Sequence, residues 1–194
     1  MDYDVLAPHI RLRLITDADA GFVVALRQDR SRSRFLHAVE NDLEAQQEWI
    51  RGSRERTARK TEYYWVVETH RHTPALPVGL VRLSSVTADS FVFGSWVMAP
   101  CAPVAAGIES YLAACDFGFG ALGCQRYFAE VRHDNGRALA FHQRVGSADQ
   151  GGSPECQRFE QTLDRYLIFR RRYRRYVLAD ELPLLLPGRP TTAS

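Results

Sequence analysis

The chain has 194 residues, of which 45% are hydrophobic, 25% charged and 11% aromatic, a composition that suits one compact domain and excludes disordered and fibrous classes of protein. Its 25 Lys and Arg residues nearly balance 23 Asp and Glu residues, and the formal net charge is +2. Six arginines lie between Arg165 and Arg175, so the rest of the chain carries a small net negative charge. This distribution argues against a protein that binds nucleic acid along its length.

No apolar run approaches the roughly 20 residues of a membrane span, and residues 1–8 lack the basic and apolar segments of a signal peptide. We therefore expect a cytoplasmic protein with no membrane partner. The four cysteines form no Cys-x-x-Cys pair, and no histidine stands at metal-ligand spacing from them. Reduced thiols are expected, with neither a disulfide framework nor a metal site.

The first half of the chain predicts a strand, two helices and three further strands. Residues 10–15 alternate apolar and arginine side chains, as a half-buried strand does, and Thr16 with Asp19 forms a capping box for a helix. Asn41 or Asp42 caps a second helix, and residues 30–40 form the loop between the two helices. The next strands are expected at 63–67, 78–83 and 91–98. Three successive strands indicate an antiparallel meander.

The second half predicts helices between strands. Apolar residues recur at helical spacing from Ile108 to Leu122, and a shorter helix follows Asn135. The remaining segments are expected as a strand at 126–131, a loop at 146–154 and strand-like segments at 157–163 and 166–173. This order predicts an α+β fold with a mixed central sheet of about seven strands and helices on both faces. We expect a single domain over 1–180 and a frayed tail over 181–194.

The order of elements resembles the GNAT superfamily of N-acetyltransferases over about residues 9 to 172. Residues Leu26-Arg27-Gln28-Asp29, the Trp49-Ile50 pair and the aromatic strand 63–67 are similar to the branch that contains ribosomal-protein N-terminal acetyltransferases and sugar-nucleotide amino-acetyltransferases. The segment Asn135-x-x-Ala138-Leu139-x-Phe141-His142-x-x-x-Gly146 resembles the superfamily's Asn-x-x-Ala-Ile-x-Leu-Tyr-x-x-x-Gly-Phe helix. The resemblance implies a GNAT-like fold and an enzyme that transfers acetyl from acetyl-CoA to a primary amine.

The resemblance also implies a phosphate-binding loop at residues 102–107. The family pattern Gln/Arg-x-x-Gly-x-Gly/Ala is matched in full only at Gly107, the last position. A helix N-terminus nevertheless presents unpaired N–H groups and a partial positive charge, and Ala105, Ala106 and Gly107 let a diphosphate approach closely. Pro103 has no N–H, and no Lys or Arg lies between Arg82 and Arg126.

Further cofactor contacts are implied at three places. Phosphate charge not met by amides would be met by arginines from elsewhere, such as Arg137. The resemblance implies that Asn135 touches the cofactor, although Asn is also a preferred helix N-cap. Strand 91–98 is expected to part from strand 126–131, so that the backbone of Val97 and Met98 pairs with the pantetheine arm. An ordinary edge strand is the alternative.

For catalysis, His142 stands where the family has the Tyr that protonates the departing thiolate, and a pKa near 6.5 suits a general acid. A histidine simply packed at the sheet edge is the open alternative. The candidates for the base are Glu130, Glu68, His37 and Glu40. We expect Glu130 to act as the base, and His37 and Glu40, in the long loop, to line the acceptor site.

The acceptor is expected to be an amino-sugar nucleotide, with Trp65 of the aromatic strand stacking on its base. A protein or peptide N-terminus is the main rival, and a non-catalytic GNAT-like binding module is a second alternative. A third interpretation takes the arginines at 165–175 as a polyanion-binding patch on a strand. We expect a small-molecule amine as partner and no nucleic acid, and a homodimer remains open.

Overall fold

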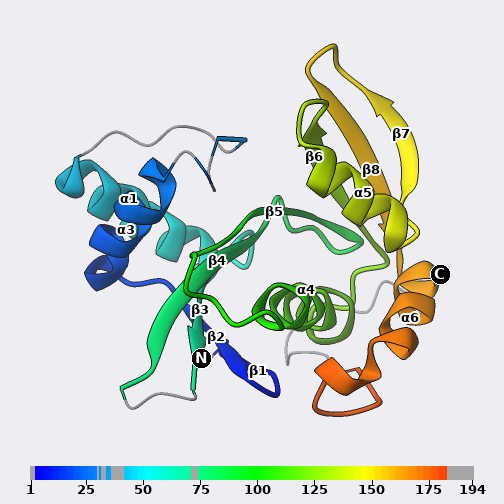
Figure 1. The fold of residues 1–194 in the computed structure, drawn as a ribbon, viewed down its shortest axis with the longest axis horizontal. Coiled ribbons are helices and arrows are strands. Elements are labelled where there is room, and N and C mark those ends of the chain that lie inside the picture. The colour runs from blue at the N-terminus through cyan, green and yellow to red at the C-terminus, as the bar shows by residue number, and fades with distance from the viewer. Residues whose placement is uncertain (1–2, 30, 32–33, 36–41, 71–73, 183–194) are drawn as a thin grey trace.

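The computed structural model describes residues 3–29, 31, 34–35, 42–70 and 74–182. Within these ranges, eight strands form one sheet in the order β1-β2-β3-β4-β5-β6-β8-β7 (Figure 1). The strands are β1 (Val5–Leu6), β2 (Ile10–Leu14), β3 (Tyr63–Thr69), β4 (Leu76–Ser84), β5 (Ser90–Met98), β6 (Arg126–Arg132), β7 (Ala148–Gly152) and β8 (Cys156–Thr162). All neighbours are antiparallel except β5 and β6, which are parallel. The mixed sheet confirms the predicted α+β fold, with one strand more than the expected seven.

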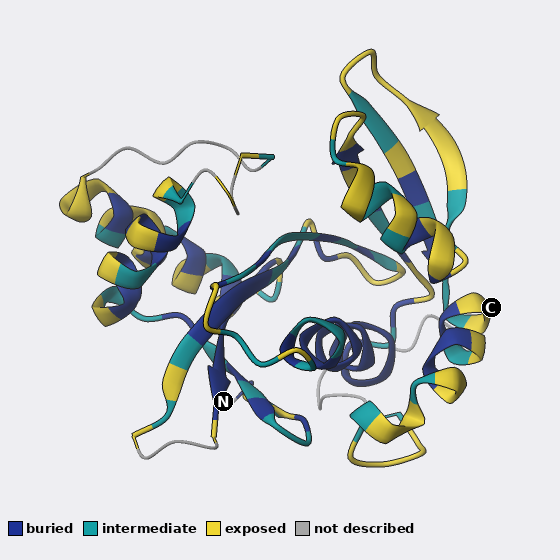
Figure 2. Ribbon diagram, in the orientation of Figure 1, coloured by how far each residue is buried: buried dark blue, intermediate teal, exposed yellow. Residues whose placement is uncertain are grey.

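Helices cover both faces of the sheet. They are α1 (Ala20–Gln28), α3 (Leu43–Ala58), α4 (Ala106–Asp116), α5 (Gly136–Arg144) and α6 (Leu163–Arg172). Because side chains alternate along a strand, β3 turns Tyr64 and Val66 toward α1 and α3, whereas Tyr63 and Trp65 face α4. Figure 2 shows that α4 is buried over most of its length. It is therefore the central helix of the larger hydrophobic core.

Three predicted helix starts are confirmed by hydrogen bonds. Asp19 Oδ2 accepts from Thr16 N at 2.7 Å and from Thr16 Oγ1 at 2.9 Å. Asp42, one of the two predicted cap residues, accepts from Ala45 N at 2.9 Å, and Asn135 Oδ1 accepts from Ala138 N at 3.2 Å. Asp42 and Asn135 each satisfy an N–H group of the first helical turn, and Asp19 satisfies the N–H group of the cap residue Thr16. Such local bonds have a sequence signature, which is why the sequence predicted these helix starts.

The prediction of a strand-like segment at 166–173 is wrong. These residues belong to α6 and to the turn that follows it. Tyr166, Phe169 and Arg170 recur at helical spacing and are buried, and the Tyr166 ring centroid lies 6.3 Å from that of Tyr111 on α4. Asp116 accepts from Arg170 Nε at 2.7 Å, from Arg170 Nη2 at 3.0 Å and from the Tyr166 hydroxyl at 2.6 Å. The ion pair between Asp116 and Arg170 joins residues 54 positions apart, so a local sequence pattern could not reveal it. Because a helix brings Tyr166 and Arg170 to the same side, this buried pair favours the helix over the strand.

Two further corrections concern the end of the domain. Residues 148–152, expected within a loop, form the edge strand β7 paired with β8. Because 166–173 is not a strand, the arginines at 165–175 do not form the strand patch of the polyanion interpretation. Arg170 also donates to the carbonyl oxygens of Ala179, Asp180 and Glu181. The predicted tail from 181 lies almost wholly outside the described residues.

Among the helices of the described residues, none is long and apolar enough to cross a bilayer.

After α4 the chain continues as a π-helical turn, Phe117–Ala121, pressed against the sheet. A Cβ on Gly118 would lie 2.4 Å from the Phe91 ring, whereas a Cβ on Gly21 of α1 would meet nothing within 4 Å. Close packing therefore requires glycine at position 118 but not at position 21.

We expect Gly118→Ala to lower the free energy of unfolding by about 1–3 kcal/mol through overpacking. Gly21→Ala should raise it by about 0.5–1 kcal/mol, because alanine is the better helix former. Urea unfolding of both variants measures the contrast. Equal effects of the two changes would contradict the tight contact between Gly118 and Phe91.

Candidate active site

A gap opens in the middle of the sheet where β5 and β6 part. The two strands pair only at Ser90 with Arg126, Phe91 with Tyr127 and Val92 with Phe128. Beyond these pairs β5 stays bonded to β4 as far as Met98, and β6 stays bonded to β8 as far as Arg132. Figure 1 shows the two strands diverging. The predicted parting is confirmed, and it places the backbone of Val97 and Met98 on an open strand edge within the described chain.

A β-bulge shapes the β5 side of this gap. The register of β5 against β4 shifts between Leu80 and Arg82, and Ser95 has a φ of 46°, in the left-handed region. A bulge of this kind bends a strand and redirects its side chains. Trp96 Nε1 donates to Ser110 Oγ on α4 at 3.0 Å, and the Trp96 ring lies 4.8 Å from that of Phe141 on α5. Trp96 thus joins the walls of the gap on its α4 side.

Sequence reasoning missed Ser95 and Trp96. A signal was present, because an isolated glycine inside a strand often marks a bulge, and Gly94 directly precedes these residues.

The N-terminus of α4 can receive an anion. Within the described chain, the backbone N–H groups of Val104, Ala105, Gly107 and Ile108 have no hydrogen-bond acceptor, whereas those of Ala106 and Glu109 are bonded to Pro103 and Ala105. Val104 is fully exposed, and the side chains of the loop are small. Free amides at the positive end of a helix suit a phosphate group. The loop therefore keeps this chemistry although it departs from the family pattern.

Asn135 and Arg137 lie at the start of α5. Because Asn135 Oδ1 is used in capping, its amide N–H groups remain the atoms that could contact a ligand. Arg137 is exposed in the first turn of the helix. Their predicted contacts with the cofactor remain predictions.

His142 points from α5 into the core. It is 4% exposed, its ring stacks on Phe159 with centroids 5.0 Å apart, and its buried Nδ1 has no hydrogen-bond partner among the described residues. Burial lowers the pKa of His142 to about 4. The imidazole is therefore neutral at neutral pH. This corrects the expectation of an imidazolium acid, which rested on the ordinary pKa near 6.5.

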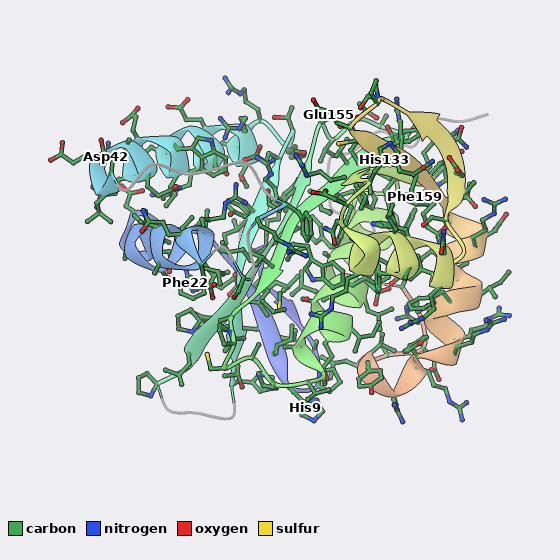
Figure 3. The ribbon with its side chains drawn as sticks, turned by 45° about the horizontal axis from the view of Figure 1, so that its top comes forward. His9, Phe22, Asp42, His133, Glu155 and Phe159 are labelled. Atoms are coloured by element: carbon green, nitrogen blue, oxygen red, sulfur yellow. The ribbon has the colours of Figure 1, made fainter. Side chains whose placement is uncertain are left out.

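Glu130 lies on the opposite face of β6 from His142. Tyr127 and Ala129 of β6 are buried beneath α5, so strand alternation turns Glu130 toward the face that carries α1 and α3, where it is exposed. Figure 3 shows α1 and α3, marked by Phe22 and Asp42, apart from α5 and Phe159. The two predicted catalytic residues are therefore not brought together on one face.

Of the residues predicted to line the acceptor site, the structure describes only Trp65. Trp65 is fully buried on the α4 face, where its Nε1 donates to Tyr3 O at 3.0 Å, so it is a core residue rather than a substrate contact. His37 and Glu40 lie outside the described residues. Glu68, the alternative base, is buried and ion-paired with Arg11 at 2.8 Å and Arg13 at 2.9 Å. These pairs give it a structural role.

Comparisons with known proteins agree with this geometry. The chain matches the profile of the acetyltransferase (GNAT) domain over residues 9–148. It is similar to apo FdhC, a nucleotide-linked sugar GNAT, with 26% identity and a TM-score of 0.82 over 91% of this chain and 99% of that chain.

Two more distant structures share the fold. One is the Vibrio cholerae spermidine N-acetyltransferase in complex with CoA and spermine, with 19% identity and a TM-score of 0.66 over 82% of this chain and 98% of that one. The other is Mycobacterium smegmatis RimJ in complex with CoA-disulfide, with 17% identity and a TM-score of 0.70 over 92% and 96%. No curated protein sequence matches significantly.

The low pKa of His142 predicts an acid-sensitive fold. The unfolded chain binds a proton at His142 near pH 6.5, whereas the folded chain does so only near pH 4. Stability is therefore unaffected above pH 6.5 and falls as the pH drops toward 4, by about 2–3 kcal/mol at pH 4.5. We expect His142→Phe to remove this component, as measured by urea unfolding at pH 7 and pH 4.5.

His133→Phe is the matched control, because His133 is exposed. If wild type and His142→Phe lose stability equally on acidification, His142 is not held neutral by burial.

Proposed function

The chain belongs to the GNAT acetyltransferase family, and from that premise we propose that it transfers the acetyl group of acetyl-CoA, the acetyl donor of this family, to a primary amine. The observation that carries the proposal is the gap between β5 and β6 beside the free amides of α4. An open strand edge can pair with an extended amide-bearing arm. The amides of Gly107 and Ile108 would receive the diphosphate.

The residues around the gap divide the remaining chemistry between them. Bound acetyl-CoA supplies an activated acetyl carbon; the carbon–nitrogen bond to the amine forms as the carbon–sulfur bond breaks. The amine must first lose a proton, and Glu130 is the base we propose, because it is an exposed carboxylate on β6 just beyond the last β5–β6 pair. Since His142 is buried and neutral, solvent supplies the proton that the departing thiolate takes up.

An amino sugar attached to a nucleotide is the acceptor we propose. Support comes from the similarity to the nucleotide-linked sugar GNAT, which exceeds the similarity to the polyamine and RimJ structures described above in both identity and TM-score. Trp65 gives this proposal no support, because its side chain is buried and cannot stack on a nucleotide base.

We expect Gly107→Asp to weaken CoA binding at least tenfold, because a carboxylate beside the free amides repels the diphosphate. Gly21→Asp is the matched control: both glycines are the second residue of a helix, and a Cβ at either position meets nothing closer than 3.9 Å. Isothermal calorimetry with CoA, on each variant and wild type, gives the comparison.

Equal affinity of the two variants would place the diphosphate elsewhere. Absence of binding to the wild type at millimolar CoA would overturn the acetyltransferase proposal.

For the base, Glu130→Gln should lower kcat/KM about 10²–10⁴-fold while CoA affinity stays unchanged. Glu160→Gln removes a carboxylate from β8, cross-strand from Phe128, and serves as its control. Thiol release with an amino-sugar nucleotide measures both. Unchanged activity in Glu130→Gln would exclude Glu130 as the base.

A further inference from the structure

The bulge in β5 turns Trp96 toward α4. The register of β5 against β4 shifts at this point, so that Ser95 and Trp96 together stand opposite the single residue Val81. Phe93 is buried on the α4 face, and without the extra residue strand alternation would turn Trp96 to the opposite face. Instead the Trp96 ring centroid lies 5.7 Å from that of Phe93 and 6.1 Å from that of Tyr111 on α4. The bulge therefore decides which face of the sheet carries Trp96.

Two hydrogen bonds connect Trp96 to the first turn of α4. Trp96 Nε1 donates to Ser110 Oγ at 3.0 Å, and Ser110 Oγ donates to Gly107 O at 3.0 Å. An indole can only donate and a carbonyl can only accept, so the direction of both bonds is fixed. Ser110 is fully buried, which keeps water from competing for its hydroxyl. We call this chain of bonds, from Trp96 through Ser110 to Gly107, the indole relay.

The indole relay ends on a peptide group whose N–H is free. Gly107 O and Ile108 N belong to one planar peptide unit, and the Ile108 N–H has no acceptor within the described chain. Hydrogen bonds in a chain polarise one another, so a bond accepted by the carbonyl makes the N–H of the same unit a stronger donor. Because the unit is planar, the bond also fixes the direction of the N–H. The relay thus acts on one of the two amides that we propose for the diphosphate.

Trp96 also lies against the other elements that border the gap. It directly precedes Val97, whose backbone lies on the open edge of β5. Its ring centroid lies 4.8 Å from that of Phe141 on α5, and a Cβ on Gly107 would lie 3.9 Å from Trp96 Cζ2. One side chain therefore connects the strand edge that would pair with the pantetheine arm to the helical turn that would hold the diphosphate.

We propose that Trp96 and Ser110 are positioning residues for the cofactor, because the indole relay orients and polarises the Ile108 N–H that receives the CoA diphosphate. The inference rests on the proposed function, since it assigns two residues to the same cofactor site. Neither residue touches the reacting atoms, so loss of the relay raises the KM for acetyl-CoA and leaves kcat within twofold. Bonds that only stabilised the fold would change the unfolding free energy and leave the CoA affinity of the folded protein unchanged.

The first test is isothermal calorimetry with CoA on Trp96→Phe, which keeps an aromatic ring and removes the N–H. We expect the affinity to fall about three- to tenfold, the usual effect of one lost hydrogen bond. Trp65→Phe is the matched control, because Trp65 Nε1 also donates one bond, to Tyr3 O at 3.0 Å, at a buried site on β3. This control should lose stability but keep its CoA affinity within twofold. Equal CoA affinity of Trp96→Phe and Trp65→Phe would overturn the proposal.

Ser110→Ala removes the middle of the indole relay. It should weaken CoA binding at least as much as Trp96→Phe does. The double variant should bind CoA no more weakly than Ser110→Ala alone, because the indole acts only through the hydroxyl. Losses that add would show that the two side chains act independently, which contradicts a relay. Alanine is the better helix former, so Ser110→Ala keeps the test open even if Trp96→Phe fails to fold.

Adenosine diphosphate separates an effect on the amide from an effect on the pantetheine arm, because it carries a diphosphate and lacks the arm. Its affinity should fall in Trp96→Phe and Ser110→Ala by the same factor as that of CoA. A loss confined to CoA would mean that Trp96 contacts the arm instead, and the relay would be wrong. The same conclusion would follow if adenosine diphosphate did not bind to the wild type.

Nuclear magnetic resonance of the free protein tests the relay without any ligand. The indole N–H of Trp96 should exchange with solvent faster in Ser110→Ala than in wild type, whereas that of Trp65 serves as internal control and should not change. Unchanged exchange at Trp96 would show that its bond to Ser110 is not made, whether or not CoA binds.

The outcomes separate the two proposals. If CoA binds equally to wild type, Trp96→Phe and Ser110→Ala, the indole relay has no role in cofactor binding and the acetyltransferase proposal stands. If the exchange of Trp96 responds to Ser110→Ala but the wild type binds no CoA, the bonds exist and both proposed functions are wrong.

Discussion

The parting of β5 from β6 after three residue pairs is the constraint on which the rest of the site depends. Two open strand edges in the middle of a sheet leave backbone groups that water or a ligand must satisfy. The bulge at Ser95 bends β5, and Trp96 then reaches Ser110 of α4 and the ring of Phe141 on α5. The sheet stays continuous where the strands begin, so the gap opens at one end only. That end is also where α4 presents its free amides.

The direction of those amides is secured by two acidic side chains of α4. Glu109, fully buried, accepts from His9 N at 2.9 Å and lies 2.5 Å from His9 Nδ1, near the start of the chain. Asp116 pairs with Arg170 and Tyr166 of α6, near the other end of the domain. Breaking a buried pair of this kind is strongly destabilising. Distant parts of the chain thus hold the helix whose N-terminus lies at the gap.

The two faces of the sheet offer different kinds of positive potential. The α4 face uses amides and the partial charge at the positive end of a helix, in a stretch with no Lys or Arg between Arg82 and Arg126. The opposite face carries full guanidinium charges, among them those of Arg56 and Arg82, which share the carboxylate of Glu62.

Local sequence determined the caps at Thr16, Asp42 and Asn135, most of the strands, and the start of α4 with its small residues, because each depends on neighbours within a few positions. The helix α6 was missed because its arginines fit alternation as well as helical spacing, and only contact with Asp116 decides between them. Burial beside Phe159 lowers the pKa of His142, the cover of α4 buries Trp65, and strand pairing sets Arg82 of β4 opposite Gly94 of β5. The sequence thus determined most of the elements and the family, whereas burial and the pairing of charges, which arise between distant residues, were decided by the tertiary structure alone.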